Sequence, residues 1–567
     1  MNTFKYHFLA YFTILGIIFT SCKDSFLEIV PSDQLTSESI FADKSGAELF
    51  MNDIYNNLPD AEGWKGSNNG TGGDGWVKGD LFENWSDNAV CRWTWGMSSV
   101  QGVARDYGPN TYRDALYNHV YPTLPFFYEP IYTYIRKCNL FISQIQNNPT
   151  RFPEVWMKTR IAEARFLRAF FYHEIWMAYG GVPIVTDVLD RLTQGEEIFH
   201  PRATSEETAT FIINELAACA EDLPNEVGIG RATKGAALTL KGWCELFSKK
   251  YASAAATNLN VMQLGVYQLF PDYNKQFFSE NNNNKESIFA YQHIAGSKYN
   301  DRTAVFGPRD FCRDGSEGSS LPSQNIVDAY RMNNGLPITD IASGYDPDQP
   351  YKNRESRFYQ SIIYDGVVFA GKTYSLKAGG GSELYNPGNE KQTGYFRRKG
   401  IIESLTAATR PQDASNYVFF RYAEVLLNFA EAKIEMGQID QSTIDAIDVV
   451  RKRGELPMLK DTYKKDSFSQ AELREIVRIE RRIELAFENK RYWDLIRWRT
   501  AMEVLNQPVY AMAYSNGKYV KVISHSMKFN EKNYLFPIYQ RWIDTNPAIK
   551  AQNGGPDNWT NGQNPGY

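Results

Sequence analysis

"VWMKTRIAEARFLRAFFYHEIWMAY" spans residues 155–179 and predicts a long helix. Small and apolar side chains recur near the i, i+4, i+7 spacing that gathers them on one face of a helix; they include Ala162, Phe166, Ala169, Phe170 and Met177. Gly180-Gly181 and then Val182-Pro183 follow directly, and such residues end a helix. The stretch therefore indicates a chain whose scaffold is built mainly from helices.

A second helical block supports helices that pack in pairs. "TKGAALTLKGWCELFSKKYASAAATNLNVMQLG" (233–265) predicts two helices hinged near Lys249-Lys250. Gly242 and Ala254 lie twelve positions apart, the spacing of the small residues where paired helices touch in tetratricopeptide repeats, although the other repeat positions match poorly. Further helices are predicted at 416–438, around 443–453 and at 469–499.

The segments between the helical blocks differ in composition. Residues 59–80 are rich in Gly, Asn and Asp, and residues 271–415 mix short alternating runs such as "SIIYDGVVFAGKTYSL" with glycine-rich loops. Irregular segments this long in a compact protein are usually functional. We therefore expect a mainly α fold, a helix-pair scaffold with a loop-rich, partly β ligand-binding face.

The N-terminus predicts export. Lys5 and His7 precede an apolar run, "FLAYFTILGIIFTSC" (8–22), which is shorter than the roughly twenty residues of a membrane-spanning helix. A charged start, an apolar run and small residues at the end are typical of a secretory signal. Cys22 stands where cleavage would fall and can carry lipid, an interpretation that we favour over an ordinary signal peptide with a chance cysteine.

Composition excludes several classes of protein. Sixty-one Lys and Arg face 66 Asp and Glu, mixed along the chain, so no basic footprint for nucleic acid is present. The cysteines after Cys22 are far apart and form no C-x-x-C motif, which indicates neither a zinc site nor a disulfide framework; they are Cys91, Cys138, Cys219, Cys244 and Cys312. Buried free thiols are expected, with one bridge left open.

Motifs that suggest catalysis are chance matches by context. "GVVFAGKT" (366–373) fits the phosphate-loop pattern, but the residues after Thr373 cannot start the helix that a phosphate loop needs. "GTGGDG" (70–75) follows a polar loop rather than a strand. No H-E-x-x-H or G-x-S-x-G motif is present, and no carboxylate pair stands out. We expect no catalytic residue, cofactor or metal, and we interpret "RIERRIELAFENKR" (478–491) as a solvated or ion-paired helix face.

The most unusual stretch is "GDGWVKGDLFENWSDNAVCRWTWG" (73–96), which holds four of the twelve tryptophans. Flat indole faces stack on the C–H faces of sugars, while interleaved carboxylates, amides and guanidinium groups meet hydroxyls. The candidate ligand contacts are Trp85, Trp93, Trp76, Trp95, Asp87, Asn88 and Arg92, with Tyr291, Tyr299 and Arg302 as the opposite wall. Trp85 and Trp93 are expected to be exposed platforms; the alternative is an aromatic mini-core that fixes a long loop.

Taken in order, these segments resemble the SusD/RagB family of outer-membrane nutrient-uptake lipoproteins. The resemblance covers essentially the whole chain. Its segments are "CKDSFLEIVPSDQLTSESIFADKSGAELFMNDIYNNL" (22–58), "EARFLRAFFYHEIWMAYGGVPIVT" (163–186), "RATKGAALTLKGWCELF" (231–247), "YKNRESRFYQSIIYDG" (351–366), "TGYFRRKG" (393–400), "FRYAEVLLNFAEA" (420–432), "VVRKRGELP" (449–457), "ERRIELAFENKRYWDLIRW" (480–498) and "YLFPIYQRWIDTNPAIKAQNGG" (534–555).

The resemblance implies a tetratricopeptide-like scaffold, a glycan-binding face, a lipid on Cys22 that holds the protein at the cell surface, and no catalysis. It also implies a partner, a TonB-dependent SusC-like outer-membrane transporter. A RagB-type peptide binder and, less favoured, a surface glycosidase are the alternatives. The expected layout is a signal peptide (1–21) and one SusD-like domain (22–567). That domain is divided into 22–270 with an aromatic loop at 59–110, a loop-rich insertion at 271–415 and a helical part at 416–567.

Overall fold

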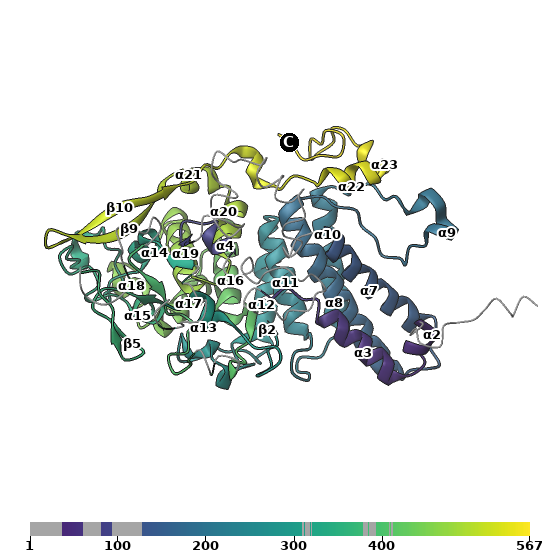
Figure 1. Ribbon diagram of the computed structural model, residues 1–567, viewed down its shortest axis with the longest axis horizontal. Coiled ribbons are helices and arrows are strands. Elements are labelled where there is room, and N and C mark those ends of the chain that lie inside the picture. The colour runs from purple at the N-terminus through teal and green to yellow at the C-terminus, as the bar shows by residue number, and fades with distance from the viewer. Residues whose placement is uncertain are drawn as a thin grey trace, which may run out of the picture.

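The computed structural model describes residues 37–60, 81–92, 128–308, 320–377, 393–406 and 412–567, with positions 311, 318, 384 and 409. Helices dominate these residues and the strands are short, which confirms the mainly α fold class. Figure 1 shows a stack of long helices on one side and a half with shorter elements and more loops on the other.

The stack runs through neighbouring helices in chain order. α7 packs on α8, α8 on α10, α10 on α11, α11 on α12, and α12 on α16, while α3 lies against α7 and α8. Their bounds are α3 Lys44–Tyr55, α7 Tyr128–Gln146, α8 Glu154–Tyr179, α10 Ser205–Asp222, α11 Lys234–Phe247, α12 Tyr251–Gln263 and α16 Tyr422–Glu435. α17 (Gln441–Arg453) and α19 (Gln470–Glu484) pack on α16. Successive packed helices of this kind make the predicted helix-pair scaffold.

Helix α8 forms where the periodicity predicts it, and the predicted stop is confirmed. Gly180 has a φ of +72°, in the left-handed region that favours glycine. A Cβ on Gly181 would lie 2.0 Å from the carbonyl oxygen of Ala203, so this position also requires glycine. Phe166 and Phe170 are buried against Phe289 of strand β2 (Ser287–Tyr291) and Phe419 of strand β8 (Tyr417–Arg421), which joins these two strands to the stack.

The predicted hinge between α11 and α12 is also confirmed. Lys249 turns the chain with a φ of +59°. A Cβ on Gly242 would lie 2.6 Å from Nδ2 of Asn258, and Ala254 is fully buried. The two helices therefore approach closely at Gly242, one of the two small residues that the twelve-residue spacing singles out, and its neighbour across the contact is Asn258.

Two helix predictions in the C-terminal third were wrong in their bounds. Residues 416–438 begin as strand β8 (Tyr417–Arg421), which pairs with β2 (Ser287–Tyr291), and only then form α16. Residues 469–499 form two helices, α19 and α20 (Arg491–Trp498), because Phe487 and Asn489 adopt positive φ values of 63° and 58°. Non-local pairing and a backbone turn override the helical periodicity here.

The remaining elements are short. Helical turns are α2 Ser37–Ile40, α4 Leu81–Asn84, α9 Arg191–Gln194, α13 Arg302–Phe306, α14 Gln324–Ala329, α15 Ser356–Ser361, α18 Leu459–Tyr463, α21 Ala501–Leu505, α22 Gln540–Thr545 and α23 Pro547–Lys550, with 3₁₀ turns η3 Gly195–Ile198, η4 Lys275–Phe277, η5 Ser279–Asn281, η6 Ile341–Ser343 and η8 Glu531–Tyr534. Two-stranded antiparallel sheets pair β1 Ala89–Cys91 with β3 Ser320–Pro322, β4 Ile362–Ile363 with β7 Phe396–Arg397, and β9 Pro508–Ser515 with β10 Lys518–Ser526.

The phosphate-loop pattern at 366–373 is a β-hairpin. β5 (Val368–Phe369) pairs with β6 (Lys372–Thr373), and Ala370 and Gly371 form the turn with φ values of +48° and +76°. Such a turn suits a tight hairpin. The described residues that follow, up to position 377, form no helix, so they do not supply the helix N-terminus that binds phosphate in a phosphate loop.

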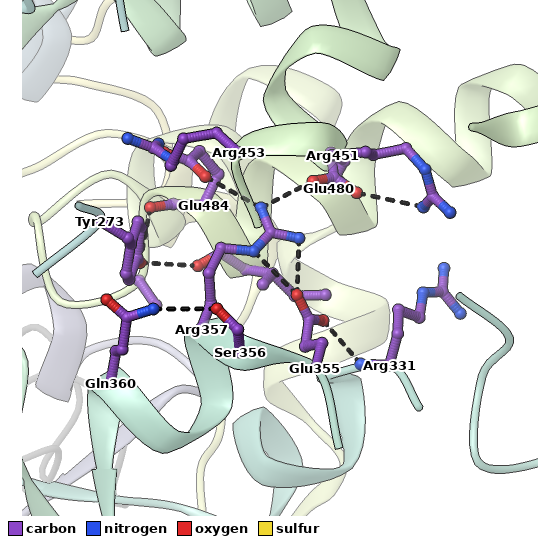
Figure 2. A network of polar contacts seen from close by, with 12 residues as sticks. Tyr273, Arg331, Glu355, Ser356, Arg357, Gln360, Arg451, Arg453, Glu480 and Glu484 are labelled. Carbon is purple, nitrogen blue, oxygen red and sulfur yellow. Dashed lines mark hydrogen bonds and ion pairs between the residues drawn. The ribbon is translucent and has the colours of Figure 1, made fainter. Parts of the chain in front are cut away.

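The charged run 478–491 is ion-paired and buried rather than solvated. Glu484 of α19 pairs with Arg357 of α15 at 2.9 Å, with Arg421 of β8 at 2.6 Å and with Arg453 of α17. Figure 2 shows the part of this network around Arg357, Arg453 and Glu484, in which Glu480 also faces Arg357 at 2.7 Å. The side chains of these residues are at most 4% exposed, so the network joins four elements inside the protein.

Cys138, Cys219 and Cys244 are free and buried, as expected, and Cys91 is buried as well; Cys312 lies outside the described residues. Burial raises the pKa of the Cys138 thiol to about 12. Within the described ranges, no helix has the length and apolarity needed to cross a membrane.

Candidate ligand-binding site

Residues 81–92 are the described part of the predicted aromatic loop, and they are anchored at both ends. α4 packs against α20, and β1 pairs antiparallel with β3, with Val90 opposite Leu321. The amide of Phe82 donates to Oδ1 of Asn489 at 3.1 Å. The segment is thus docked onto α20 and Asn489 in the C-terminal third of the chain and onto β3 in its middle.

Trp85 lies inside this docked segment. Its side chain is 1 % exposed, and its ring centroid lies 5.6 Å from that of Phe82 and 5.7 Å from those of Tyr492 and Phe536. The expectation that Trp85 is an exposed platform was wrong, because its ring is enclosed by other aromatic rings. Trp85 instead belongs to an aromatic mini-core, the alternative given above.

Asp87 also helps to hold residues 81–92 in place. Its carboxylate pairs with Arg491 at 2.9 Å and with Arg482 at 2.8 Å. Burial alone would raise the pKa of Asp87, but the two guanidinium groups lower it to about 2. The carboxylate is therefore held as an anion by internal partners rather than presented to a ligand.

Asn88 and Arg92 are buried as well, with Asn88 fully enclosed. Asn88 donates from Nδ2 to Oε2 of Glu83 at 2.9 Å and accepts from Nε of Arg482 at 2.8 Å. Glu83 in turn accepts from the amide of Asn489 at 3.0 Å. Sequence reasoning missed Glu83, although it lies within the quoted tryptophan-rich stretch.

Trp76, Trp93 and Trp95 lie outside the described residues, and their contact with ligand stays a prediction. The docked segment is flanked by 61–80 on one side and 93–127 on the other. The internal contacts of residues 81–92 therefore fix the two positions at which this segment meets its flanking segments, residue 81 and residue 92.

A second group of polar contacts, the polar junction, lies around Asp60, the residue that precedes the flanking segment 61–80. Nε2 of His293 lies 3.1 Å from Oδ2 of Asp60, and its Nδ1 lies 2.8 Å from the carbonyl oxygen of Ser415. Nζ of Lys298 donates to Oδ1 of Asn56 at 2.5 Å. Sequence reasoning missed this junction because its members are far apart in the chain.

Tyr291 belongs to this junction. Its ring lies 4.1 Å from the Lys298 ammonium and 5.2 Å from the His293 ring, and its side chain is buried. Burial raises the pKa of Tyr291, and burial lowers the pKa of Lys298. The prediction that Tyr291 forms a ligand-facing wall was wrong, since protein groups cover its ring.

Arg302 is also internal. It is 2 % exposed and donates to the carbonyl oxygens of Phe277 at 3.1 Å and Asn416 at 3.3 Å. A Cβ on Gly400 would lie 2.6 Å from Nη1 of Arg302, which shows how closely the backbone encloses the guanidinium. The predicted ligand contact by Arg302 is therefore corrected to a structural role. Of the described candidates, only Tyr299 is not buried.

No group of three or more metal-ligating side chains occurs in the described part of the chain.

Comparison with known proteins adds what the site geometry leaves open. A family model described as the SusD family matches residues 285–559, and one described as starch-binding and associating with the outer membrane matches residues 86–241. The chain belongs to the SusD/RagB family.

Relatives of this SusD/RagB protein match it over nearly its full length. It is 22% identical to SusD-like protein P38 of Formosa agariphila, over 97% of this chain and 99% of that one. A SusD-like protein from Bacteroides fragilis has a TM-score of 0.74 and 27% identity, with 94% and 99% of the two chains covered. A SusD-like carbohydrate-binding protein from the same organism has a TM-score of 0.73 and 28% identity, with 90% and 100% covered.

Proposed function

We propose that this chain is a cell-surface lipoprotein that captures oligosaccharides and delivers them to a TonB-dependent SusC-like transporter in the outer membrane. The observation that carries the proposal is the likeness to a SusD-like carbohydrate-binding protein, over 90% of this chain and 100% of that one. The starch-binding description of the family model over residues 86–241 agrees with it.

The proposed ligand contacts are the candidates that the structure leaves available. Tyr299 is half-buried, and Trp76, Trp93 and Trp95 belong to the segments that start from the docked residues 81–92. An aromatic ring presented from a fixed base loses little entropy on binding, which favours affinity. Trp85 and Asp87 support this site by holding its base.

We propose binding without catalysis. A glycosidase needs a carboxylic acid with a raised pKa beside a second carboxylate. Burial raises the pKa of Glu163 and of Asp448. Glu163 is engaged by Tyr55, Arg160 and Arg231, and Asp448 accepts from the amide of Leu459. Internal contacts thus account for both groups.

A glycan array on the lipid-free protein beginning at Lys23 tests the proposal. We expect binding to oligosaccharides, with no new reducing ends after incubation. Release of reducing ends would support the glycosidase, and binding to a peptide library without any glycan would support the RagB-type peptide binder. Co-purification of the lipidated protein with a co-expressed SusC-like transporter tests the partner.

A further inference from the structure

A pocket of about 440 Å³ lies between the loop before α11 and strand β2. Residues 225–231 and Thr233 form one wall, residues 283–285 and Gln292 the other, and Tyr267 and β2 complete the lining. Ligand pockets of roughly 300–1,000 Å³ hold small molecules. None of the sugar-binding candidates that the structure describes lines this pocket.

The charges around the pocket are compensated. Arg231 pairs with Glu163 at 3.0 Å and with Glu48 at 2.8 Å, and it also donates to Asn52. Lys285 and Glu226 face each other at 3.9 Å. Because neither cation is left without a carboxylate, the pocket favours a neutral ligand over a phosphate or carboxylate.

The pocket nevertheless offers groups that suit a polyhydroxylated ring. Asn225, which is exposed, and Ser287, which is half-buried, line the pocket, and neither side chain is engaged by another protein group in the structure as described, so both are open to a ligand. Tyr267 is fixed there, with its hydroxyl 3.1 Å from that of Thr233. Ile229 adds an apolar side chain that is 80% exposed. Apolar walls with a few placed polar groups and an aromatic face are how small sugars are held.

A chain of hydrogen bonds connects the pocket with Asp60, where the first segment of the predicted aromatic loop starts. Asn283 and Gln292 exchange hydrogen bonds of 3.0 and 3.1 Å across the pocket wall. Asn416 donates to Gln292 at 2.9 Å and accepts from the amide of His293 at 3.1 Å. His293 contacts Asp60. The pocket therefore lies beside the base of the proposed glycan-binding loop.

We propose that this pocket is a second binding site for a neutral saccharide unit, in addition to the contacts proposed above. The proposal rests on the proposed glycan-binding function. Ser287 and Asn225 hydrogen-bond the hydroxyls of the sugar, and Tyr267 lies against its ring. The two sites then hold either one glycan chain at two points along its length or two separate glycan chains.

The test is calorimetric titration of the lipid-free full-length chain with maltoheptaose, laminariheptaose and xylohexaose. The pocket variant is Asn225→Ala with Ser287→Ala, which removes only side chains that lack internal partners. The matched control, Asn260→Ala with Ser253→Ala, makes the same chemical change on α12, away from the pocket lining. We expect two binding events with at least one oligosaccharide, one of them weakened about tenfold or more in the pocket variant only.

The outcomes separate this inference from the proposed function. Equal binding by the pocket variant and the control would overturn the second site and leave glycan binding intact. Absence of binding to all three oligosaccharides in the wild type would contradict both proposals. A single event that the pocket variant weakens would support the saccharide pocket and contradict the aromatic loop as the other site. Equal melting temperatures of all three proteins verify that folding is unchanged.

Discussion

Single residues of the segment 81–92 make contacts that are very distant in sequence. Asp87 pairs with Arg491, which is 404 positions further along the chain, and Asn88 accepts from Arg482, 394 positions away. Trp85 fills the apolar space between these polar contacts and is 1 % exposed. The three side chains together fix a short segment whose regular elements are one helical turn, α4, and one short strand, β1.

Trp85→Ala should destabilise the protein by about 3–5 kcal/mol, because it leaves a cavity among aromatic rings. Urea unfolding of the lipid-free protein measures this loss. The half-buried Trp542, which contacts Tyr539 at the surface turn α22, provides the control, and Trp542→Ala should cost clearly less. Equal stability of wild type and the Trp85 variant would show that the ring is not part of the core.

Cys22→Ser should release the protein from the membrane fraction or leave its signal peptide uncleaved, because serine offers no thiol for lipid. Membrane fractionation and mass spectrometry of the wild-type protein check this result. More than one acyl chain is expected, since a single chain gives only marginal attachment. A wild-type protein without lipid would contradict the proposed anchoring.

At the scale of elements, contacts between neighbouring helices limit which side chains fit, and the contact between α11 and α12 is the clearest example. Gly242→Ala should improve the helix propensity of α11, yet its new Cβ would lie 2.6 Å from Nδ2 of Asn258. We expect a net loss of about 1–3 kcal/mol from overpacking. Thermal or urea unfolding gives the value.

A double-mutant cycle tests the cause of that loss. Removing the facing amide in Gly242→Ala with Asn258→Ala should destabilise less than the two single changes added together. Strict additivity would show that the glycine and the asparagine do not compete for the same space. The buried amide of Asn258 donates to the carbonyl oxygen of Ala254, so Asn258→Ala alone has its own cost.

Elements defined by local signals were predictable from the sequence, and elements defined by distant partners were not. α8 ends at Gly180, and α11 and α12 meet at Lys249, as glycine chemistry and periodicity predict. β8 was predicted as helix because its apolar residues fit either period, and only pairing with β2 decides between them. The same limit applies to the site: Trp85 and Asp87 look like ligand contacts until Tyr492 and Arg491 are placed beside them.

The whole molecule is tied together by buried ion pairs, and these should make its stability depend on acid pH. Burial would raise the pKa of Glu488, but Arg421 and Lys399 lower it from 4.5 to about 2. The pKa of Asp87 is lowered from 3.8 to about 2. Between about pH 4.5 and 2 the unfolded chain therefore binds more protons than the folded one, and the stability falls as the pH falls.

Urea unfolding across this pH range checks the prediction. Glu488→Gln should be less stable than wild type at pH 7, because Arg421 and Lys399 lose a charged partner, and should lose less of its remaining stability on acidification. Glu197→Gln, an exposed change, should follow the wild-type curve. If the stability of the Glu488 variant fell with pH as steeply as that of the wild type, the ion pairs of Glu488 with Arg421 and Lys399 would be excluded as a cause of acid unfolding.

The docking of residues 81–92 onto the end of the chain also has a consequence for the order in which the protein folds. A polypeptide leaving the ribosome has made Trp85 long before Tyr492, Arg482 and Arg491 exist. Helices α7, α8, α10, α11 and α12 contact their sequence neighbours and can form early, whereas this segment must wait for the last hundred or so residues. Closing so long a loop is slow, so residues 81–92 should be among the last of the described parts to become ordered. A nascent or truncated chain would expose the rings of Phe82 and Trp85.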